Sequence, residues 1–274
     1  MANLAEATRV ADTDGELSSI IDNAWSIWGP ISGYVAAIAL RAVGAMVPAG
    51  HRPVTFTCQY VARGNAGPVS IDVIPIKSGG TACHHVQLQQ EGRPFLFAQV
   101  WTTARAGTPV ATAPVMPDVP PPDTLQPVDD LFRRHGHDVA DFWKVIDGRQ
   151  VDFRAVDDTD PRGGRTERWL RIKEWTATDD PFLDAARALI GIDTHIWPAH
   201  VRSIAGTPPY VAPSLDLCVW FHSAVPSSPW QLIEARADVI GDSLLSGTAR
   251  AWSEDGQLIA SGGSQCLVVP KRPA

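Results

Sequence analysis

One structural unit occurs twice along this chain, and the repeat constrains the fold more than any other feature of the sequence. In each half, a long apolar segment with the pattern of a helix is followed by four strand-like runs that are joined by short turns. The two helical segments cover residues 28–48 and 180–192. A unit that recurs in this order predicts a duplicated fold with two similar domains in tandem.

The first helical segment reads WGPISGYVAAIALRAVGAMVP. Gly29 and Pro30 open it, and Pro48 ends it. Because the segment is apolar nearly all round, we expect protein to enclose it on most sides. The strand-like runs that follow are separated by RGNAG, SGG and EGR and cover residues 54–62, 69–77, 81–90 and 94–103.

The second helical segment, DPFLDAARALIGI, has Asp180 as its predicted N-cap and Pro181 at its first position. Its strand-like runs cover residues 214–222, 230–239, 244–252 and 257–269. Two more strands are predicted ahead of this helix, QVDFRAV at 150–156 and RTERWLRIKEW at 165–175. Hairpin connections favour antiparallel pairing, so the pattern predicts an α+β protein in which each sheet wraps one apolar helix.

A proline-rich stretch, APVMPDVPPPDTLQP, separates the two halves. Its proline density favours an extended linker. We therefore predict an N-terminal domain at residues 1–108, a linker at 109–128 and a C-terminal domain at 129–274.

The strand-like run APSLDLCVWFH, residues 212–222, carries a carboxylate at its centre. Strand side chains alternate between two faces, so Leu215, Leu217, Val219 and Phe221 share an apolar core face. The same alternation places Asp216 and Ser214 together on the opposite face. That face is either a solvated surface or a functional site.

Charge and cysteine usage narrow the classes of function. The net charge of −7 and the absence of a basic run give no support to a nucleic-acid partner. No apolar run approaches the ~20 residues that span a bilayer. The cysteines, which form no Cys-x-x-Cys pair, are expected to be buried free thiols in a reducing cytoplasm: Cys58, Cys83, Cys218 and Cys266.

Three segments resemble the acyl-CoA thioesterase II family, the double-hotdog thioesterases. They are GPISGYVAAIALRA, DDPFLDAARALIGIDTHIWP, and APSLDLCVWFH together with the downstream DGQLIASGGSQ. The resemblance covers most of the chain. It implies a double hotdog fold, in which two curved antiparallel sheets each wrap a long apolar helix. It also implies hydrolysis of a fatty acyl-CoA to a free fatty acid and CoA, in lipid metabolism, without a metal or other cofactor.

The same resemblance suggests site residues. Asp216 matches a carboxylate that activates water, and Gln265 matches an amide that shares this water. A hydroxyl residue should complete the set, but the matching region reads ARADVIGDS, which offers Asp238 and, downstream, Ser243. The family also implies a homo-oligomer, a dimer or a tetramer of double hotdogs.

Residues at the start of the first helix are candidates for substrate contact. Gly29 and Gly33 either let the helix approach the sheet or expose backbone donors to a carbonyl oxygen. Trp28 is a candidate for the wall of an acyl tunnel, although core packing and an oligomer interface explain a tryptophan equally well.

Thioester hydrolysis requires an oriented water, donors for the developing oxyanion and a leaving thiolate. A carboxylate in an apolar site suits the first task, because desolvation raises its basicity. Two other functions stay open. One is a hotdog hydratase or dehydratase acting on enoyl-CoA, which would pair an Asp with a His. The other is a catalytically weak protein that binds acyl-CoA or an acyl carrier.

Overall fold

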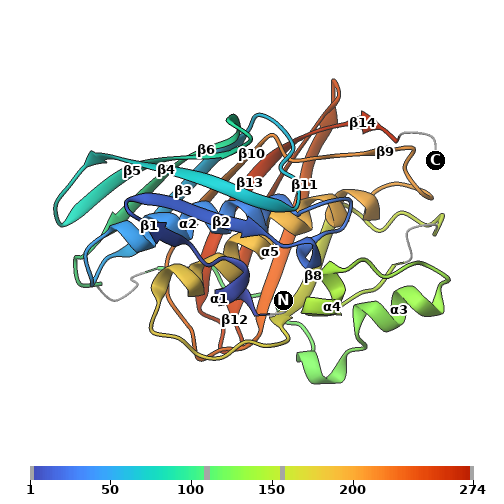
Figure 1. The fold of residues 1–274 in the computed structure, drawn as a ribbon. Helices are drawn as coiled ribbons and strands as arrows, with labels where there is room; N and C mark the ends of the chain where they lie inside the picture. The colour runs from blue at the N-terminus through green and yellow to red at the C-terminus, as the bar shows by residue number, and fades with distance from the viewer. Residues whose placement is uncertain (1–2, 108–111, 155–157, 272–274) are drawn as a thin grey trace.

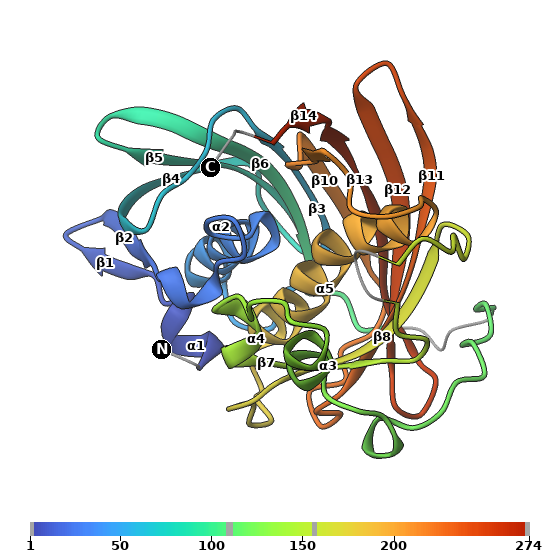
Figure 2. The same ribbon diagram turned by 90° about the vertical axis from the view of Figure 1, so that its right-hand side faces the viewer.

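The computed structural model describes residues 3–107, 112–154 and 158–271. A strongly curved antiparallel sheet curls around two long helices that lie side by side in its concave face (Figure 1; Figure 2). The protein is therefore mixed α+β, with the two helix-and-sheet units predicted from the repeat, arranged as the double hotdog that the resemblance implies.

The N-terminal half contains one long helix, α2 (Ser32–Met46), and four long strands. The strands are β3 (Arg52–Tyr60), β4 (Gly67–Lys77), β5 (Thr81–Gln90) and β6 (Arg93–Thr103). Short elements precede them: α1 (Leu4–Ala7), β1 (Ala11–Thr13), β2 (Glu16–Ile21) and the 3₁₀ turn η1 (Asn23–Trp25).

The C-terminal half is built around α5 (Pro181–Arg202) and the strands β10 (Asp216–Phe221), β11 (Gln231–Gly241), β12 (Leu244–Ser253) and β13 (Leu258–Leu267). Ahead of α5 come the 3₁₀ turn η2 (Pro122–Thr124), α3 (Val128–Arg134), α4 (Phe142–Val145), β7 (Ile146–Gln150) and β8 (Arg165–Ile172). A separate pair of short strands joins β9 (Tyr210–Val211) to β14 (Val269–Pro270).

Two predicted elements lie elsewhere than expected. Helix α5 continues ten residues beyond the predicted end at Ile192, because residues such as Ile196 and Ala199 stay fully buried and keep the helix in the core, even with Pro198 inside it. The strand predicted at 150–156 ends at Gln150 instead. Its Asp147–Gly148 pair has the composition of a turn, but pairing with β8 holds it extended. Residues 155 and 156 of that prediction fall outside the described residues.

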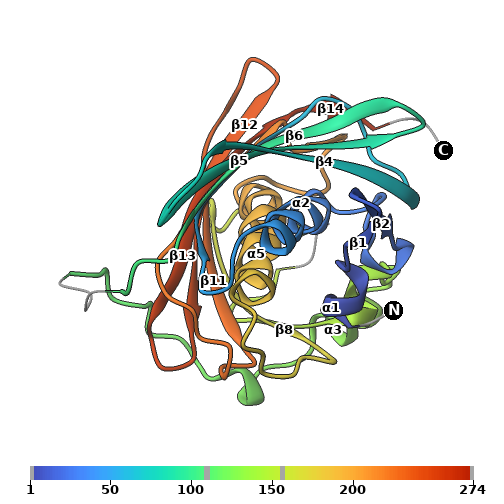
Figure 3. The same cartoon turned by 60° about the vertical axis from the view of Figure 1, so that its left-hand side comes forward.

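The sheets of the two halves form one continuous sheet of twelve strands. Its order is β1-β2-β4-β5-β6-β3-β10-β13-β12-β11-β8-β7. The halves join where β3 pairs antiparallel with β10, with Cys58 opposite Leu217. Figure 3 shows both helices inside this shared curve. The join places β3 against both helices and β10 against α5.

Helices α2 and α5 run antiparallel and very close together. A side chain at Gly33 would put its Cβ 2.9 Å from the Cα of Ile190, and one at Gly44 would put it 2.7 Å from the ring of Phe182. Near the other end, Arg41 of the apolar α2 forms an ion pair with Asp180. The glycines therefore permit the close approach that brings the start of α2 to the middle of α5.

Part of the proline-rich stretch covers the outer face of the sheet instead of spanning open solvent. Met116, Val119 and Leu125 pack against a cluster formed by Trp169, Trp230, Leu232 and Trp252. The indole N–H of Trp169 donates to the carbonyl of Pro120 (3.0 Å). Within the described residues, no helix is long and apolar enough to cross a bilayer.

Candidate active site

A carboxylate of α5, Asp193, meets the start of α2 where the two helices are closest. Its Oδ2 accepts a hydrogen bond from the backbone N–H of Gly33 (2.7 Å), and its Oδ1 accepts one from Ser214 Oγ (2.9 Å). Helix α2 has no side-chain cap of its own and no acidic residue in its first turn. Asp193 therefore supplies both the acceptor and the negative charge that a helix N-terminus favours.

The surroundings of Asp193 make it an unusually basic carboxylate. Burial raises its pKa to about 6, although the hydrogen bonds from Ser214 and Gly33 act in the opposite direction. The residue is still partly exposed, so it is not sealed in the core. A carboxylate with a pKa near 6 is mostly ionised at pH 7 and accepts a proton more readily than an ordinary Asp.

The neighbouring groups stay protonated. Burial, with the nearby Asp193 charge, raises the pKa of the Cys266 thiol to about 12 and moves the pKa values of Cys58 and Tyr60 well above their usual range. The hydroxyl of Tyr60 donates to the carbonyl of Ser32 (2.9 Å). Asp193 therefore has neutral neighbours in Tyr60, Cys58 and Cys266 at neutral pH.

Ser214 lies on the opposite side of the sheet from the one that strand alternation predicted. The regular strand β10 starts only at Asp216, and ahead of it Ser214 forms an isolated bridge with Cys266. Strict alternation does not hold in this irregular stretch, so the Ser214 hydroxyl points inward to α5. The structure thus separates Ser214 from Asp216 and joins it to Asp193.

Asp216 and Gln265, the pair suggested by the sequence, do lie together. The contact runs from the backbone N–H of Gln265 to Asp216 Oδ1 (2.7 Å), while the Gln265 side chain is exposed. Ser264 Oγ donates to the backbone carbonyl of Asp216 (2.6 Å). The Asp216 carboxylate therefore serves as an acceptor for the neighbouring strand at the start of β10.

Asp238 and Ser243 are not brought to this pair. Asp238 sits at a bulge of β11, where it accepts from Arg236 Nε (2.6 Å) and contacts Thr248 Oγ1 (3.4 Å). Ser243 occupies the tight turn after β11, with a φ of 62°. Because β12 and β13 lie between β11 and β10, roughly 14 Å of sheet separates Asp238 from Asp216.

The residues proposed for substrate contact surround the start of α2. Gly33 provides the N–H that binds Asp193. Trp28 is 53% exposed and packs edge-on against Trp197, with ring centroids 5.7 Å apart. Gly29 adopts a φ of 144°, and the Arg63 guanidinium occupies the space that a side chain there would need. Trp197 follows Asp193 by one helical turn, so the two tryptophans form an accessible aromatic surface beside the carboxylate.

Sequence reasoning missed Asp193 and Ser214. The signal for Asp193 was a carboxylate that interrupts the apolar run ARALIGID, which is the argument applied to Asp216. The signal for Ser214 was a hydroxyl just ahead of a buried strand. Among the described residues, no group of three or more His, Cys, Asp or Glu side chains is placed to bind a metal ion.

Two domain profiles match the chain. The profile of the acyl-CoA thioesterase N-terminal domain matches residues 21–103, and that of the acyl-CoA thioesterase C-terminal domain matches residues 117–268. No curated protein matches the chain.

Solved structures share the fold over nearly the whole chain. A hot dog protein of unknown function from Alicyclobacillus acidocaldarius is 21% identical with a TM-score of 0.80, over 99% of this chain and 98% of that one. A putative thioesterase II from Thermobifida fusca is 16% identical with a TM-score of 0.79, over 98% of both chains. The acyl-CoA thioesterase II TesB2 from Mycobacterium marinum is 17% identical with a TM-score of 0.73, over 98% and 99%.

Proposed function

The chain belongs to the acyl-CoA thioesterase family, whose N- and C-terminal domains it matches in order, and we propose that Asp193 and Ser214 form its catalytic centre. The protein is accordingly a thioester hydrolase. The observation that carries the proposal is Asp193 itself: a partly exposed residue whose carboxylate has a pKa of about 6 and is held by a hydroxyl and by a helix N-terminus.

In this proposal, Asp193 holds and deprotonates the water that attacks the thioester carbonyl carbon. Ser214 orients the carboxylate and the water through its hydroxyl. The positive end of α2 faces the oxygen on which negative charge develops, and such preorganised dipoles contribute strongly to catalysis. The C–S bond then breaks, and CoA leaves as a thiolate with the free acid as the other product. Neither a metal ion nor a covalent intermediate is needed.

Asp216 with Gln265 is the competing proposal for the water-activating pair. It involves the same chemistry on the outer face of β10. Asp216 is already bound to the backbone N–H of Gln265, however, and no hydroxyl side chain contacts its carboxylate among the described hydrogen bonds. Asp238 and Ser243 receive no support as partners of either carboxylate. Gly29, Gly33 and Trp28 remain our proposed substrate contacts, because Gly33 binds Asp193 and Trp28, beside Gly29, packs on Trp197, one helical turn from Asp193.

Two other functions receive less support. A hydratase would pair the carboxylate with a histidine, but the recorded partners of Asp193 are Ser214 and Gly33. The reading as a weak acyl-CoA-binding protein rested on a missing hydroxyl, which Ser214 supplies. Ser214 thus favours hydrolysis over both alternatives.

The test compares thiol release from short to long acyl-CoAs by wild type, Asp193→Asn and Asp216→Asn. Asp193→Asn should lower kcat by about 10²–10⁴, the usual contribution of a general base. Asp216→Asn should keep most of the activity. The opposite pattern would assign catalysis to Asp216, and no turnover by the wild type on any chain length would exclude acyl-CoA hydrolysis.

A homo-oligomer is our proposal for the assembly, and the outer face of the central strands supports it. Three rows of paired residues cross this face from β5 through β6, β3 and β10 to β13. Asp216 is the one charged side chain in these rows. The uncharged members are Gln87, Phe97, Gln59, Gln265, His85, Gln99, Thr57, Cys218, Gly263, Cys83, Trp101, Thr55, Trp220 and Ser261. Phe97 and Trp220 are 42% and 49% exposed. Loss of charge with enrichment in aromatic residues is typical of interface cores.

Sedimentation velocity of wild type and Trp220→Glu tests the assembly. A charge at this position should dissociate a dimer or tetramer into smaller species, and a wild-type monomer at every concentration would refute the proposal.

A cytoplasmic location is also proposed, because Cys58, Cys83, Cys218 and Cys266 are all free thiols.

A further inference from the structure

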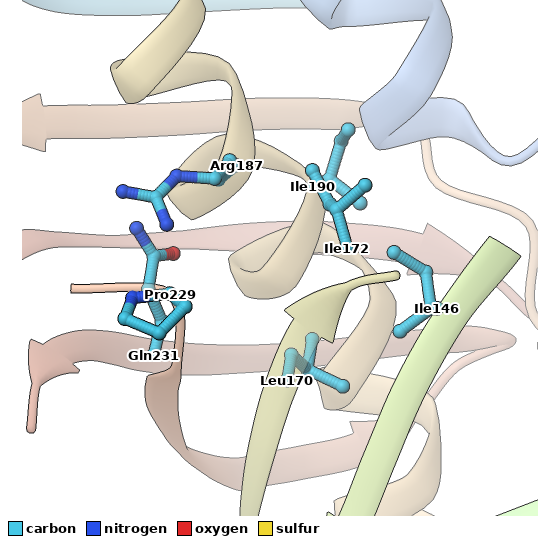
Figure 4. A pocket seen from close by; sticks show the side chains of 7 residues that line it. All are labelled: Ile146, Leu170, Ile172, Arg187, Ile190, Pro229 and Gln231. Atoms are coloured by element: carbon cyan, nitrogen blue, oxygen red, sulfur yellow. The ribbon is translucent and has the colours of Figure 1, made fainter. Parts of the chain in front are cut away.

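A small cavity lies beside α5, enclosed by β7, β8 and β11 (Figure 4). Its walls are apolar and are formed mainly by Ile146, Leu170, Ile172 and Ile190. One end is polar, where Arg187 and Gln231 point toward one another. The enclosed volume is about 20 Å³, which is room for the terminal atoms of a chain and not for a whole acyl group.

The polar end offers hydrogen-bond donors that protein atoms do not use. Arg187 and Gln231 are only 6% and 3% exposed. Nε of Arg187 and Nε2 of Gln231 have no acceptor among the described residues. A buried donor without an acceptor is unfavourable, so these groups favour an oxygen atom in the space between them.

The positive charge of Arg187 is already balanced. Its guanidinium forms a buried ion pair with Asp184, donates to the carbonyls of Ser228 (2.8 Å) and Val225 (3.2 Å), and stacks on the ring of Trp175 at 3.8 Å. A carboxylate at this end would add an uncompensated buried charge. The cavity therefore suits a neutral acceptor, such as a hydroxyl, ether or ketone oxygen.

The cavity is next to the proposed catalytic centre. Ile190 lines it, and the Cα of Ile190 lies against Gly33, whose N–H binds Asp193. Arg187 precedes Asp193 by six residues on the same helix, which is ~9 Å along the helix axis. A short acyl chain with its thioester at Asp193 would span this distance.

We propose that this cavity receives the distal end of the acyl group, and that the preferred substrates carry a neutral oxygen near that end. The proposal rests on the catalytic centre at Asp193. The apolar walls bind the chain, while Arg187 and Gln231 bind the oxygen and disfavour a purely hydrocarbon end.

The experiment compares pairs of acyl-CoAs of equal length, one alkanoyl and one with a terminal hydroxyl or a subterminal ketone. At the best chain length, kcat/KM should be at least about tenfold higher for the oxygenated member. Gln231→Met keeps a similar volume without donors and should lower this preference about tenfold, so that the two members of a pair react at similar rates. Gln89→Met, on the exposed face of β5, is the matched control and should leave the preference unchanged.

Calorimetry with non-hydrolysable thioether analogues of the same pairs separates this inference from the proposed function. Hydrolysis without a preference for the oxygenated acyl group, or a preference that Gln231→Met does not alter, would overturn the cavity's role. The donors would then be hydrogen-bonded to a bound water. Preferential binding without hydrolysis would overturn the proposed catalysis and support the cavity. If the wild type neither binds the analogues nor releases thiol from any acyl-CoA, both proposals fail.

Discussion

Replacing Asp193 with asparagine should abolish most of the activity and at the same time stabilise the protein at neutral pH. Asparagine has nearly the same shape as aspartate. Its carbonyl can accept from the Gly33 N–H, and its amide can donate to Ser214 Oγ, so the contacts at the helix crossing persist. The change therefore removes a charge and a base without opening a cavity.

The size of the stabilisation follows from the pKa of Asp193. Burial raises it from 3.8 to about 6, so between these values the native state holds a proton that the unfolded state has lost. Wild-type stability should accordingly fall as pH rises through this window. Two pKa units correspond to about 3 kcal/mol, which is the stabilisation expected of Asp193→Asn at pH 7. At pH 4 the two proteins should be equally stable.

Two assays are needed on the same samples. Urea unfolding at pH 4 and pH 7 gives the free energy of unfolding, and thiol release from acyl-CoA between pH 5 and 8 gives kcat. Wild-type kcat should rise through pH 6 as Asp193 loses its proton, and the variant should show a low rate with no such rise. Asp216→Asn, measured in parallel, should keep the wild-type pH profile.

Two results would refute this reasoning. A kcat for Asp193→Asn within about threefold of wild type would show that Asp193 does not activate the water. Lower stability of Asp193→Asn at pH 7 would show that the ionised carboxylate stabilises the helix start more than burial disfavours it. In the second case, Asp193 is primarily the N-cap of α2.

Three further substitutions test the site and its supports. Ser214→Ala should lower kcat by roughly 10-fold through the lost hydrogen bond, and Ser214→Thr should restore it; a full rate for Ser214→Ala would remove Ser214 from the mechanism. Gly33→Ala should cost about 1–3 kcal/mol in urea unfolding, because the new Cβ would lie 2.9 Å from Ile190; unchanged stability would mean that the helices move apart easily. Asp184→Asn should cost about 3–5 kcal/mol by leaving the Arg187 guanidinium buried and unpaired, and a loss below 1 kcal/mol would show that water reaches the pair.

The order of helices and strands was predictable because it depends on local periodicity. The apolar segment at 28–48 contains α2, and the run at 81–90 coincides with β5. Where prediction failed, a tertiary contact overrode a local signal. Pairing with β8 kept Asp147 and Gly148 in a strand, and burial of residues beyond Ile192 extended α5 past its predicted end.

The candidate site was harder to predict, because its members are far apart in the sequence. Asp193, Ser214 and Gly33 lie on one helix, on an irregular stretch and on a second helix of the other half. The predicted partners of Asp216 were placed by matching segments in line, but Asp238 lies across two intervening strands. Aligning segments by their order in the sequence carries no information on which strands become neighbours in the sheet.

By itself, the sequence determined that this protein has two similar helix-and-strand units, and its resemblance indicated a thioesterase. Both are encoded locally, in the spacing of apolar side chains and in short motifs. Only the tertiary structure decided which carboxylate is buried and held by a helix N-terminus. The pKa of Asp193 depends on the closeness of α2 and α5 and on the inward turn of Ser214, and both arise from packing between segments that are distant in the chain.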